Sequence, residues 1–227
     1  MLLTIAVDGP VGAGKSTVSD EVCRRLGILH LDTGAMYRAV GLCALKNGID
    51  PGDEEKVSAL CRDGKVRVDV EFSGNGQKTL LDGQDVSEDI RTQDAGAAAS
   101  AVSRYTAVRD MMVRRQQEMA REQSMLLDGR DIGTVVLPDA KLKIYLTASP
   151  EIRARRRMQQ LRKKGDETPF EEILREVNAR DYQDTHRALT PLRQAEDAVL
   201  LDGSELDFEQ TVDAILRLVE ERYGKAE

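Results

Sequence analysis

A glycine-rich stretch near residue 10 limits the possible folds of this chain more than any other feature. Gly9 and Gly14 are separated by four residues and are followed directly by Lys15 and Ser16. Small residues at such positions let successive backbone N–H groups turn inward around phosphate oxygens. The lysine adds a positive charge at the outer phosphates, and the serine hydroxyl can ligate Mg²⁺. The stretch therefore predicts a loop that binds the phosphates of a nucleoside triphosphate.

The residues on either side of the loop support this interpretation. The apolar run Leu2–Val7 ends at Asp8, directly before the loop, as expected of a buried parallel strand. After the loop, Val18, Val22 and Leu26 recur at four-residue spacing, which indicates an amphipathic helix. Strand, glycine loop and helix is the order that a phosphate-binding loop requires, so a turn that binds nothing is the weaker interpretation.

Length, charge and cysteine content exclude several classes of protein. With 227 residues the chain can bury the core of one α/β domain with appendages. A net charge of −7 argues against non-specific binding of nucleic acid. The three cysteines form no CxxC pair and are expected to be reduced thiols. The sequence has no apolar run of about 18 residues and no basic leader, so we expect a cytoplasmic protein with no membrane partner.

Five apolar runs predict a doubly wound parallel sheet, because helical stretches lie between most of them. Four of the runs end at an aspartate, and polar groups at the carboxyl ends of parallel strands are where open α/β sheets bind ligands. The runs are Leu2–Val7, Ile28–Leu31, Met125–Leu127, Lys143–Leu146 and Ala198–Leu201.

Two segments depart from this pattern. Residues 64–86 alternate apolar and polar side chains around a Ser73–Gly76 turn and an Asp82-Gly83 turn, which predicts a small antiparallel insert. Residues 149–187 are rich in arginine and predict two helices around a Gly165–Pro169 turn. Further helices are expected near residues 34–47, 53–62, 93–103 and 106–122.

Several charged residues follow predicted strands. Asp128 ends an apolar strand in the manner of a Walker B aspartate, whose carboxylate would orient Mg²⁺ or its waters near Ser16. Arg130 could hold a phosphate with two hydrogen bonds and Asp131 could read a polar base edge, although a local Arg–Asp surface pair is the plainer alternative. Thr33 could simply cap the helix that follows it.

The basic run at residues 153–164 has two interpretations. Charge runs usually form solvated helix faces, but a mobile arginine-bearing lid is a common way to neutralise a transferring phosphate and exclude water. Arg180, Asp184 and Arg187 follow at helical spacing. The run comprises Arg153, Arg155, Arg156, Arg157, Arg162, Lys163 and Lys164, and only some of these are expected to act.

Taken together, these motifs resemble the bacterial cytidylate kinases of the nucleoside monophosphate kinase group, over nearly the whole chain. The DGRD-x-GTVV segment and the insert at 64–86 are the more specific features. The matching segments are Asp8–Thr17, Asp32–Arg38, Ile90–Gln93, Asp128–Val136 and Arg180-Asp181. Two positions depart from the group: Ser16, where glycine is common, and Gln183, where a further arginine can occur and which we leave out of the site.

The resemblance implies a P-loop NTPase fold with a five-stranded parallel sheet, a β insert and a helical lid. It implies a core of residues 1–32, 122–148 and 188–227, a monophosphate-binding region of 33–121, and a lid of 149–187. The implied reaction transfers a phosphoryl group from ATP to CMP or dCMP, with Mg²⁺, in pyrimidine nucleotide metabolism. We expect a monomer that binds these small substrates and no nucleic acid.

The resemblance also implies roles for individual residues. The ATP phosphates would be bound by Gly9, Pro10, Val11, Gly12, Ala13, Gly14, Lys15, Ser16 and Thr17. The pocket for CMP would comprise Thr33, Tyr37, Arg38, Ser100, Arg109, Arg130, Asp131, Arg180, Asp184 and Arg187. The catalytic cations would be Lys15, Arg130, Arg157 and Arg187, and Ser16 and Asp128 would serve the metal, the latter through water.

Elementary chemistry agrees with this assignment. Cytosine presents an N4 amino donor, which a carboxylate can accept, whereas uracil would turn its O4 toward Asp131 and mispair polar groups. The nucleophile is a phosphate oxygen whose second pKa is about 6, so no catalytic base is expected.

Three alternatives remain open from the sequence. The chain could phosphorylate another small acceptor, such as UMP, AMP or a hydroxyl metabolite. It could be a nucleotide-dependent switch that binds partners and turns over slowly. A nucleic-acid-binding module built on the arginine run is the least favoured, because the chain is acidic and aromatic residues are not interleaved with the arginines.

Overall fold

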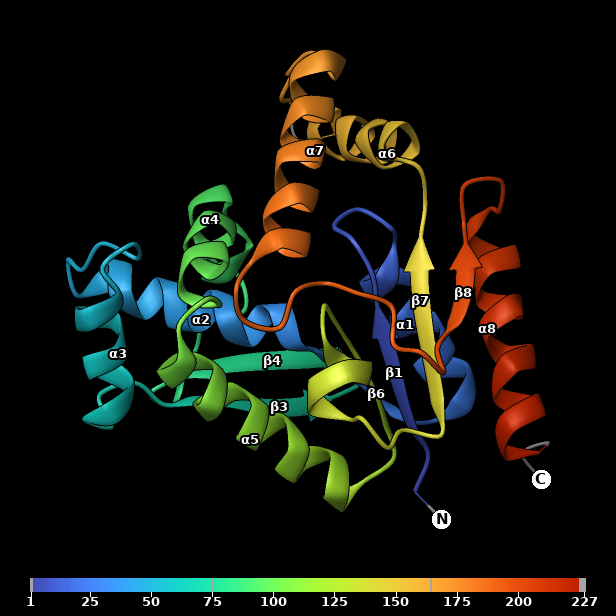
Figure 1. Ribbon diagram of the computed structural model, residues 1–227, viewed down its shortest axis with the longest axis horizontal. Helices are drawn as coiled ribbons and strands as arrows, with labels where there is room; N and C mark the ends of the chain where they lie inside the picture. The colour runs from blue at the N-terminus through green and yellow to red at the C-terminus, as the bar shows by residue number, and fades with distance from the viewer. Residues whose placement is uncertain (1, 75, 164, 225–227) are drawn as a thin grey trace. The chain divides into compact units, whose positions relative to one another are not determined.

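The computed structural model describes residues 2–74, 76–163 and 165–224, and it divides the chain into two compact units. The first unit comprises Leu3–Ile28 and the chain from Met125 onward, and the second comprises Leu29–Ser124 with Leu2. Both can be followed in Figure 1 by their element labels. Asn75 of the predicted turn and Lys164 of the basic run lie outside the described residues.

The first unit is built on parallel strands β1 (Thr4–Asp8), β6 (Met125–Gly129), β7 (Leu142–Thr147) and β8 (Val199–Asp202). Strand β1 lies between β6 and β7, so it is covered by a neighbour on both edges. With β2 (Leu29–Asp32), which is assigned to the second unit, the strands form a sheet in the order β2-β6-β1-β7-β8. The predicted five-stranded sheet is therefore confirmed.

Helices α1 (Lys15–Leu26) and α8 (Phe208–Tyr223) pack on this sheet. Their buried residues, such as Val22 and Ile215, share one apolar cluster with Ile5 and Ile144 of the strands. At its start α8 has a capping box, in which Asp207 and Gln210 each accept a hydrogen bond from the other's backbone N–H. Such reciprocal bonds satisfy donors that a helix start leaves free.

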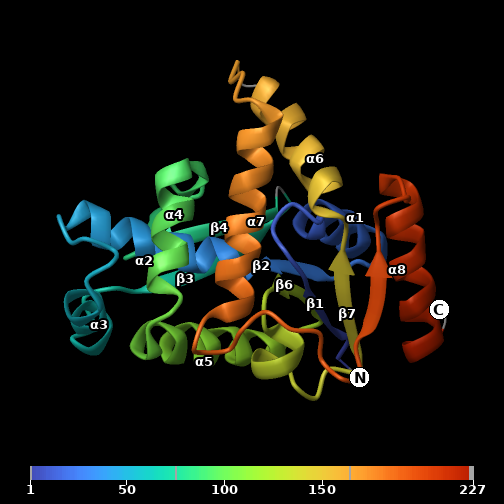
Figure 2. The same ribbon diagram turned by 45° about the horizontal axis from the view of Figure 1, so that its top comes forward.

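Two further helices continue from the carboxyl end of β7, as Figure 2 shows: α6 (Pro150–Arg162) and α7 (Phe170–His186). Ser149 caps α6 by accepting a hydrogen bond from the Ile152 N–H, and Pro150 occupies the first turn, where its missing N–H costs nothing. The pair has a small core of its own around Ala154, Ile173 and Val177. The two helices predicted for residues 149–187 are thus confirmed.

The second unit combines helices with a three-stranded antiparallel sheet. The sheet comprises β3 (Val68–Ser73), β4 (Gly76–Leu81) and β5 (Gln84–Asp85), with β4 in the centre, which confirms the predicted insert. The helices are α2 (Thr33–Lys46), α3 (Glu54–Arg62), α4 (Gln93–Val102) and α5 (Thr106–Glu122), with a short 3-10 turn at Asp89–Arg91.

Helices α2 and α4 approach each other closely because α2 carries a glycine at the crossing. A Cβ atom at Gly41 would lie 2.7 Å from the Cβ of Ala98, so any side chain there would force the helices apart. The four helix predictions agree with the observed ends to within one residue. Within the described ranges, none of the helices has an apolar stretch of the length that a bilayer span requires.

Candidate functional site

The glycine-rich stretch forms a loop from the end of β1 to the start of α1. Gly9, Gly12 and Gly14 have φ angles of 151°, 77° and 97°, a region that other residues rarely adopt. A Cβ atom at Gly9 would lie 1.9 Å from the carbonyl oxygen of Leu146, so this path of the loop leaves no room for a side chain at position 9. Gly14 precedes α1 and offers no capping side chain, which leaves the helix N–H groups available to an anion.

The ammonium of Lys15 lies inside this loop. It donates hydrogen bonds to the carbonyl oxygens of Gly9 at 2.8 Å and Pro10 at 2.9 Å. Burial, and after it the nearby positive charge of Arg130, lower the pKa of Lys15 to about 7, although Asp128 and Asp8 act in the opposite direction. Two cations held this close favour an anionic ligand, which would raise the pKa of the lysine again.

Ser16 and Asp128 meet at the carboxyl end of β6. The Ser16 hydroxyl donates a hydrogen bond of 2.8 Å to the carboxylate of Asp128, which is buried. A hydroxyl and a carboxylate are hard oxygen donors of the kind Mg²⁺ takes, with waters and phosphates completing its shell. No group of three or more acidic, histidine or cysteine side chains that could hold a metal occurs within the described ranges. The two residues therefore fit a magnesium ion.

The Arg130-Asp131 segment lies against the end of α7. Arg130 donates from Nε to Asp184 at 2.8 Å, and Arg180 Nε lies 3.6 Å from the same carboxylate. Arg187 Nη2 lies 3.9 Å from Asp131 Oδ1. Burial opposes ionisation of Asp184, but the charges of Arg130, Arg180 and Arg187 outweigh it and lower its pKa. The structure thus gathers five of the predicted site residues into one charged cluster, which we call the arginine cluster.

Two arginines of α6 contact the phosphate loop directly. Arg153 is buried and donates to the Val11 carbonyl at 3.1 Å, while its guanidinium forms two hydrogen bonds with Asp181 of α7. Arg156 donates to the Ala13 carbonyl at 3.1 Å. Sequence reasoning passed over both in favour of Arg157, which is exposed on the same helix. The sequence does not distinguish Arg153 and Arg156 from the other arginines, because arginines crowd the first turns of this helix.

The remaining predicted residues lie in the second unit. Thr33, Tyr37 and Arg38 are on α2, with Arg38 paired to Asp32 at 2.7 Å. Arg109 of α5 is buried with its guanidinium 6.0 Å from the centre of the Tyr37 ring, and Ser100 is half-buried on α4.

One local interpretation was wrong. Thr33 does not cap α2; it is the first residue of the helix, and the cap is Asp32, whose side chain accepts from the Ala35 N–H at 3.0 Å. Asp32 is held in turn by Gln77 of β4, whose side-chain oxygen accepts its backbone N–H at 2.8 Å. The insert therefore orders the start of α2, a role for Gln77 that the sequence did not reveal.

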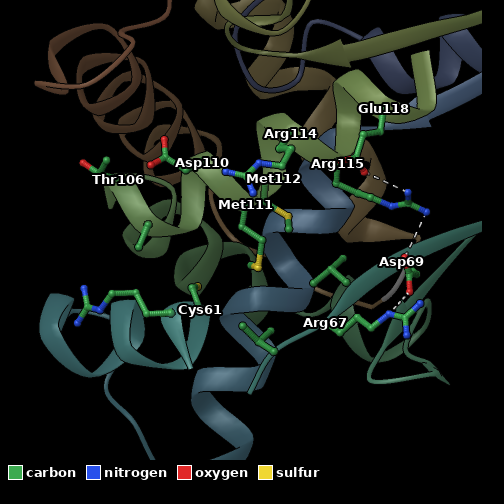
Figure 3. A pocket seen from close by; sticks show the side chains of 14 residues that line it. Cys61, Arg67, Asp69, Thr106, Asp110, Met111, Met112, Arg114, Arg115 and Glu118 are labelled. Atoms are coloured by element: carbon green, nitrogen blue, oxygen red, sulfur yellow. Dashed lines mark hydrogen bonds and ion pairs between the residues drawn. The ribbon is translucent and has the colours of Figure 1, made fainter. Parts of the chain in front are cut away.

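A hollow of about 760 Å³ in the second unit lies among α3, β3 and α5 (Figure 3). Its lining includes Met111 and Met112 of α5, and Arg67 and Arg115 both turn toward Asp69, at 2.6 Å and 3.3 Å. Among the described residues that line it, none belongs to the predicted site. The hollow is therefore not the predicted nucleotide pocket.

Comparisons with known proteins agree with this chemistry. A family model described as cytidylate kinase matches residues 5–221. Cytidylate kinase of Caldicellulosiruptor bescii is 44% identical over 95% of each chain. That of Bacteroides thetaiotaomicron is 45% identical over 98% of this chain and 97% of the relative.

Two similar solved structures, both of low sequence identity, give information on the fold alone. An uncharacterised protein from Eubacterium ventriosum has a TM-score of 0.54 at 11% identity and covers 97% of this chain and 99% of its own. Shikimate kinase from Bacteroides thetaiotaomicron has a TM-score of 0.50 at 13% identity with the same coverage. Both are similar in fold to this chain.

Proposed function

This chain belongs to the cytidylate kinase family, and from that premise we propose how its residues transfer a phosphoryl group from ATP to CMP or dCMP. The enzyme takes ATP as donor and a cytidine nucleotide as acceptor. Residues of the phosphate loop bind the donor, and residues of the arginine cluster bind the acceptor.

The loop binds the donor. The backbone N–H groups of the loop Gly9–Thr17, in which Pro10 has none, surround the ATP phosphates. Lys15 exchanges its bonds to the Gly9 and Pro10 carbonyls for phosphate oxygens. The exchange is favourable because a buried ammonium gains an opposite charge in place of two carbonyl dipoles. Ser16 and, through water, Asp128 hold Mg²⁺, which when bound neutralises phosphate charge.

The arginine cluster binds the acceptor. Arg130 and Arg187, with Arg38, hold the CMP phosphate, and Asp131 accepts from the N4 amino group of cytosine. Arg180 and Asp184 contact the sugar or its surroundings. The second unit supplies the remaining contacts, from Thr33, Tyr37, Ser100 and Arg109.

The transfer itself needs no catalytic base. An oxygen of the CMP phosphate, already ionised at neutral pH, forms a bond to the γ-phosphorus while the bond from that phosphorus to the β-phosphate oxygen breaks. The products are CDP and ADP, so atoms and charges balance without a proton transfer in the step. Lys15, Arg130, Arg187 and Arg157 neutralise the charge, and segment 149–187 acts as a lid that excludes water.

The observation that carries this proposal is that Arg130, paired with Asp184, lies close to the phosphate loop. Its positive charge is near enough to lower the pKa of the buried Lys15. We further propose that the enzyme acts as a monomer in the cytoplasm, with its three cysteines as reduced thiols outside any disulfide, and binds neither nucleic acid nor membrane.

A coupled assay of ADP production with CMP, dCMP, UMP and AMP tests the proposal. The expected result is rapid turnover with CMP or dCMP and slow turnover with UMP and AMP. Preference for UMP or AMP would overturn the assignment of Asp131. ADP production that does not depend on any acceptor would support a slow nucleotide switch instead.

A further inference from the structure

Asp8 is a buried carboxylate that the mechanism above does not use. It is the last residue of β1, 4% exposed, and the next residue opens the phosphate loop. Its backbone is held from both sides, in register with Gly129 of β6 and Tyr145 of β7. A residue fixed in this way at the centre of a sheet is a rigid platform for its side chain.

The Asp8 side chain reaches the segment that carries Arg130 and Asp131. Oδ1 accepts the N–H of Ile132 and Oδ2 accepts the N–H of Gly133, both at 2.7 Å. These two N–H groups begin the helical turn Ile132–Val136, directly after Asp131. Both oxygens of one carboxylate therefore fix two consecutive peptide groups, and this determines the position as well as the orientation of the segment.

The space around Gly133 is matched to this contact. A Cβ atom at position 133 would lie 3.2 Å from Lys143 Cδ, which is tighter than ordinary contact, and 3.4 Å from Asp8 Oδ2, which is at its close limit. A side chain there would crowd Lys143 and the carboxylate of Asp8. Glycine gives the backbone the most room to approach Asp8 closely.

We propose that Asp8 is a positioning residue for phosphoryl transfer, which holds Arg130 and Asp131 in register with the phosphate loop. The inference rests on the proposed function, because Arg130 and Asp131 are the acceptor-binding residues there. In this role Asp8 acts through its bonds to the Ile132 and Gly133 N–H groups and not through a contact with either nucleotide. It acts by linking the strand end that opens the loop, at Gly9, to the segment that receives CMP, so that donor and acceptor phosphates are presented at a constant separation.

Asp8→Asn tests the inference, since asparagine has the same size but presents an NH₂ group to one of the two N–H donors. We expect kcat/KM for CMP to fall about tenfold or more, the range for a lost hydrogen bond to a charged group. The preference for CMP over UMP should fall with it, and the KM for ATP should stay within about twofold, because the loop glycines are untouched.

The matched control is Asp207→Asn, which changes another aspartate of the first unit that accepts a backbone N–H, that of Gln210 at 2.8 Å. It should leave both KM values and the CMP preference unchanged. If Asp8→Asn gives too little folded protein, Gly133→Ala perturbs the same contact from the other side and should change the CMP values in the same direction.

A double-variant cycle separates this inference from the proposed function. If Asp131→Ala lowers the CMP preference and Asp8→Asn adds no further loss in that background, Asp8 acts through Asp131. If Asp131→Ala lowers the preference but Asp8→Asn leaves CMP kinetics unchanged, the inference is overturned and the function stands. If Asp131→Ala leaves the preference unchanged, the base-reading role of Asp131 is wrong. In that case a raised KM for CMP in Asp8→Asn supports the positioning role of Asp8, and an unchanged KM for CMP overturns it. Equal changes in the KM for ATP and CMP would indicate a general structural role and overturn the inference.

Discussion

Replacing Asp184 by asparagine should destabilise the protein and weaken its grip on CMP. The carboxylate lies 2.8 Å from Arg130 Nε, and the two side chains are 8% and 22% exposed. Breaking a fully buried ion pair by removing one partner costs about 3–5 kcal/mol, and exposed pairs contribute about 0–1 kcal/mol. Because Arg130 keeps some contact with water, we expect a loss of about 2–3 kcal/mol. For a chain of this length that lowers the Tm by about 5–10 °C.

The assay is thermal unfolding near pH 7, with Glu167→Gln as the matched control. Glu167 lies 3.7 Å from Arg162, but the side chains are 78% and 57% exposed, so water screens the pair and the Tm should hardly change. The KM for CMP should rise in Asp184→Asn only, because Arg130 loses the partner that orients it. Equal Tm values for Asp184→Asn and Glu167→Gln would refute the reasoning.

The pH dependence of this effect has a definite sign. The pKa of Asp184 is lower in the folded protein than in the unfolded chain, because its arginine neighbours favour the charged form more than burial disfavours it. Its stabilisation is therefore complete above the unfolded pKa of about 3.9 and is lost as the pH falls through the folded value. The Tm difference between wild type and Asp184→Asn should accordingly shrink below about pH 4.

Two further predictions concern the donor side. Arg153→Met removes the bonds to Val11 and Asp181, so it should raise the KM for ATP and increase ATP hydrolysis relative to transfer. Steady-state assays check this against Arg155→Met, a control at an exposed position of the same helix. Equal behaviour of the two variants would count against a lid that is held to the loop by Arg153. Ser16→Ala removes a metal-ligating hydroxyl, so more Mg²⁺ should be needed for half-maximal activity at fixed ATP. An unchanged Mg²⁺ titration would exclude Ser16 as a ligand.

Much of the fold could be predicted because its signals are local. The spacing of Gly9, Gly14 and Lys15 is read within one loop, and the positive φ angles of the two glycines are the conformations that such a loop requires. The strands and the antiparallel insert follow from apolar runs and period-two alternation, which reflect burial on one or both faces. The residues of the candidate site were named from these motifs and from family resemblance, and their roles stay predictions.

The start of α2 is a local feature that was predicted wrongly. Thr33 and Asp32 are adjacent and both are among the common capping residues, with aspartate the better of the two. In the structure Asp32 is the cap, and its backbone N–H is bound by Gln77, 45 residues away. The residues around position 32 do not predict a contact with a side chain so far along the chain.

The sequence by itself determined that this chain has a phosphate loop, a parallel sheet and the residue types of a cytidylate kinase, because each follows from neighbours along the chain. Only the tertiary structure decided which charges work together. It selected Arg153 and Arg156 from a uniform run, paired Arg130 with Asp184 across 54 positions, and set Asp8 against two N–H groups more than 120 positions away. Buried charges and donors must find partners wherever packing brings them, and packing depends on the whole chain.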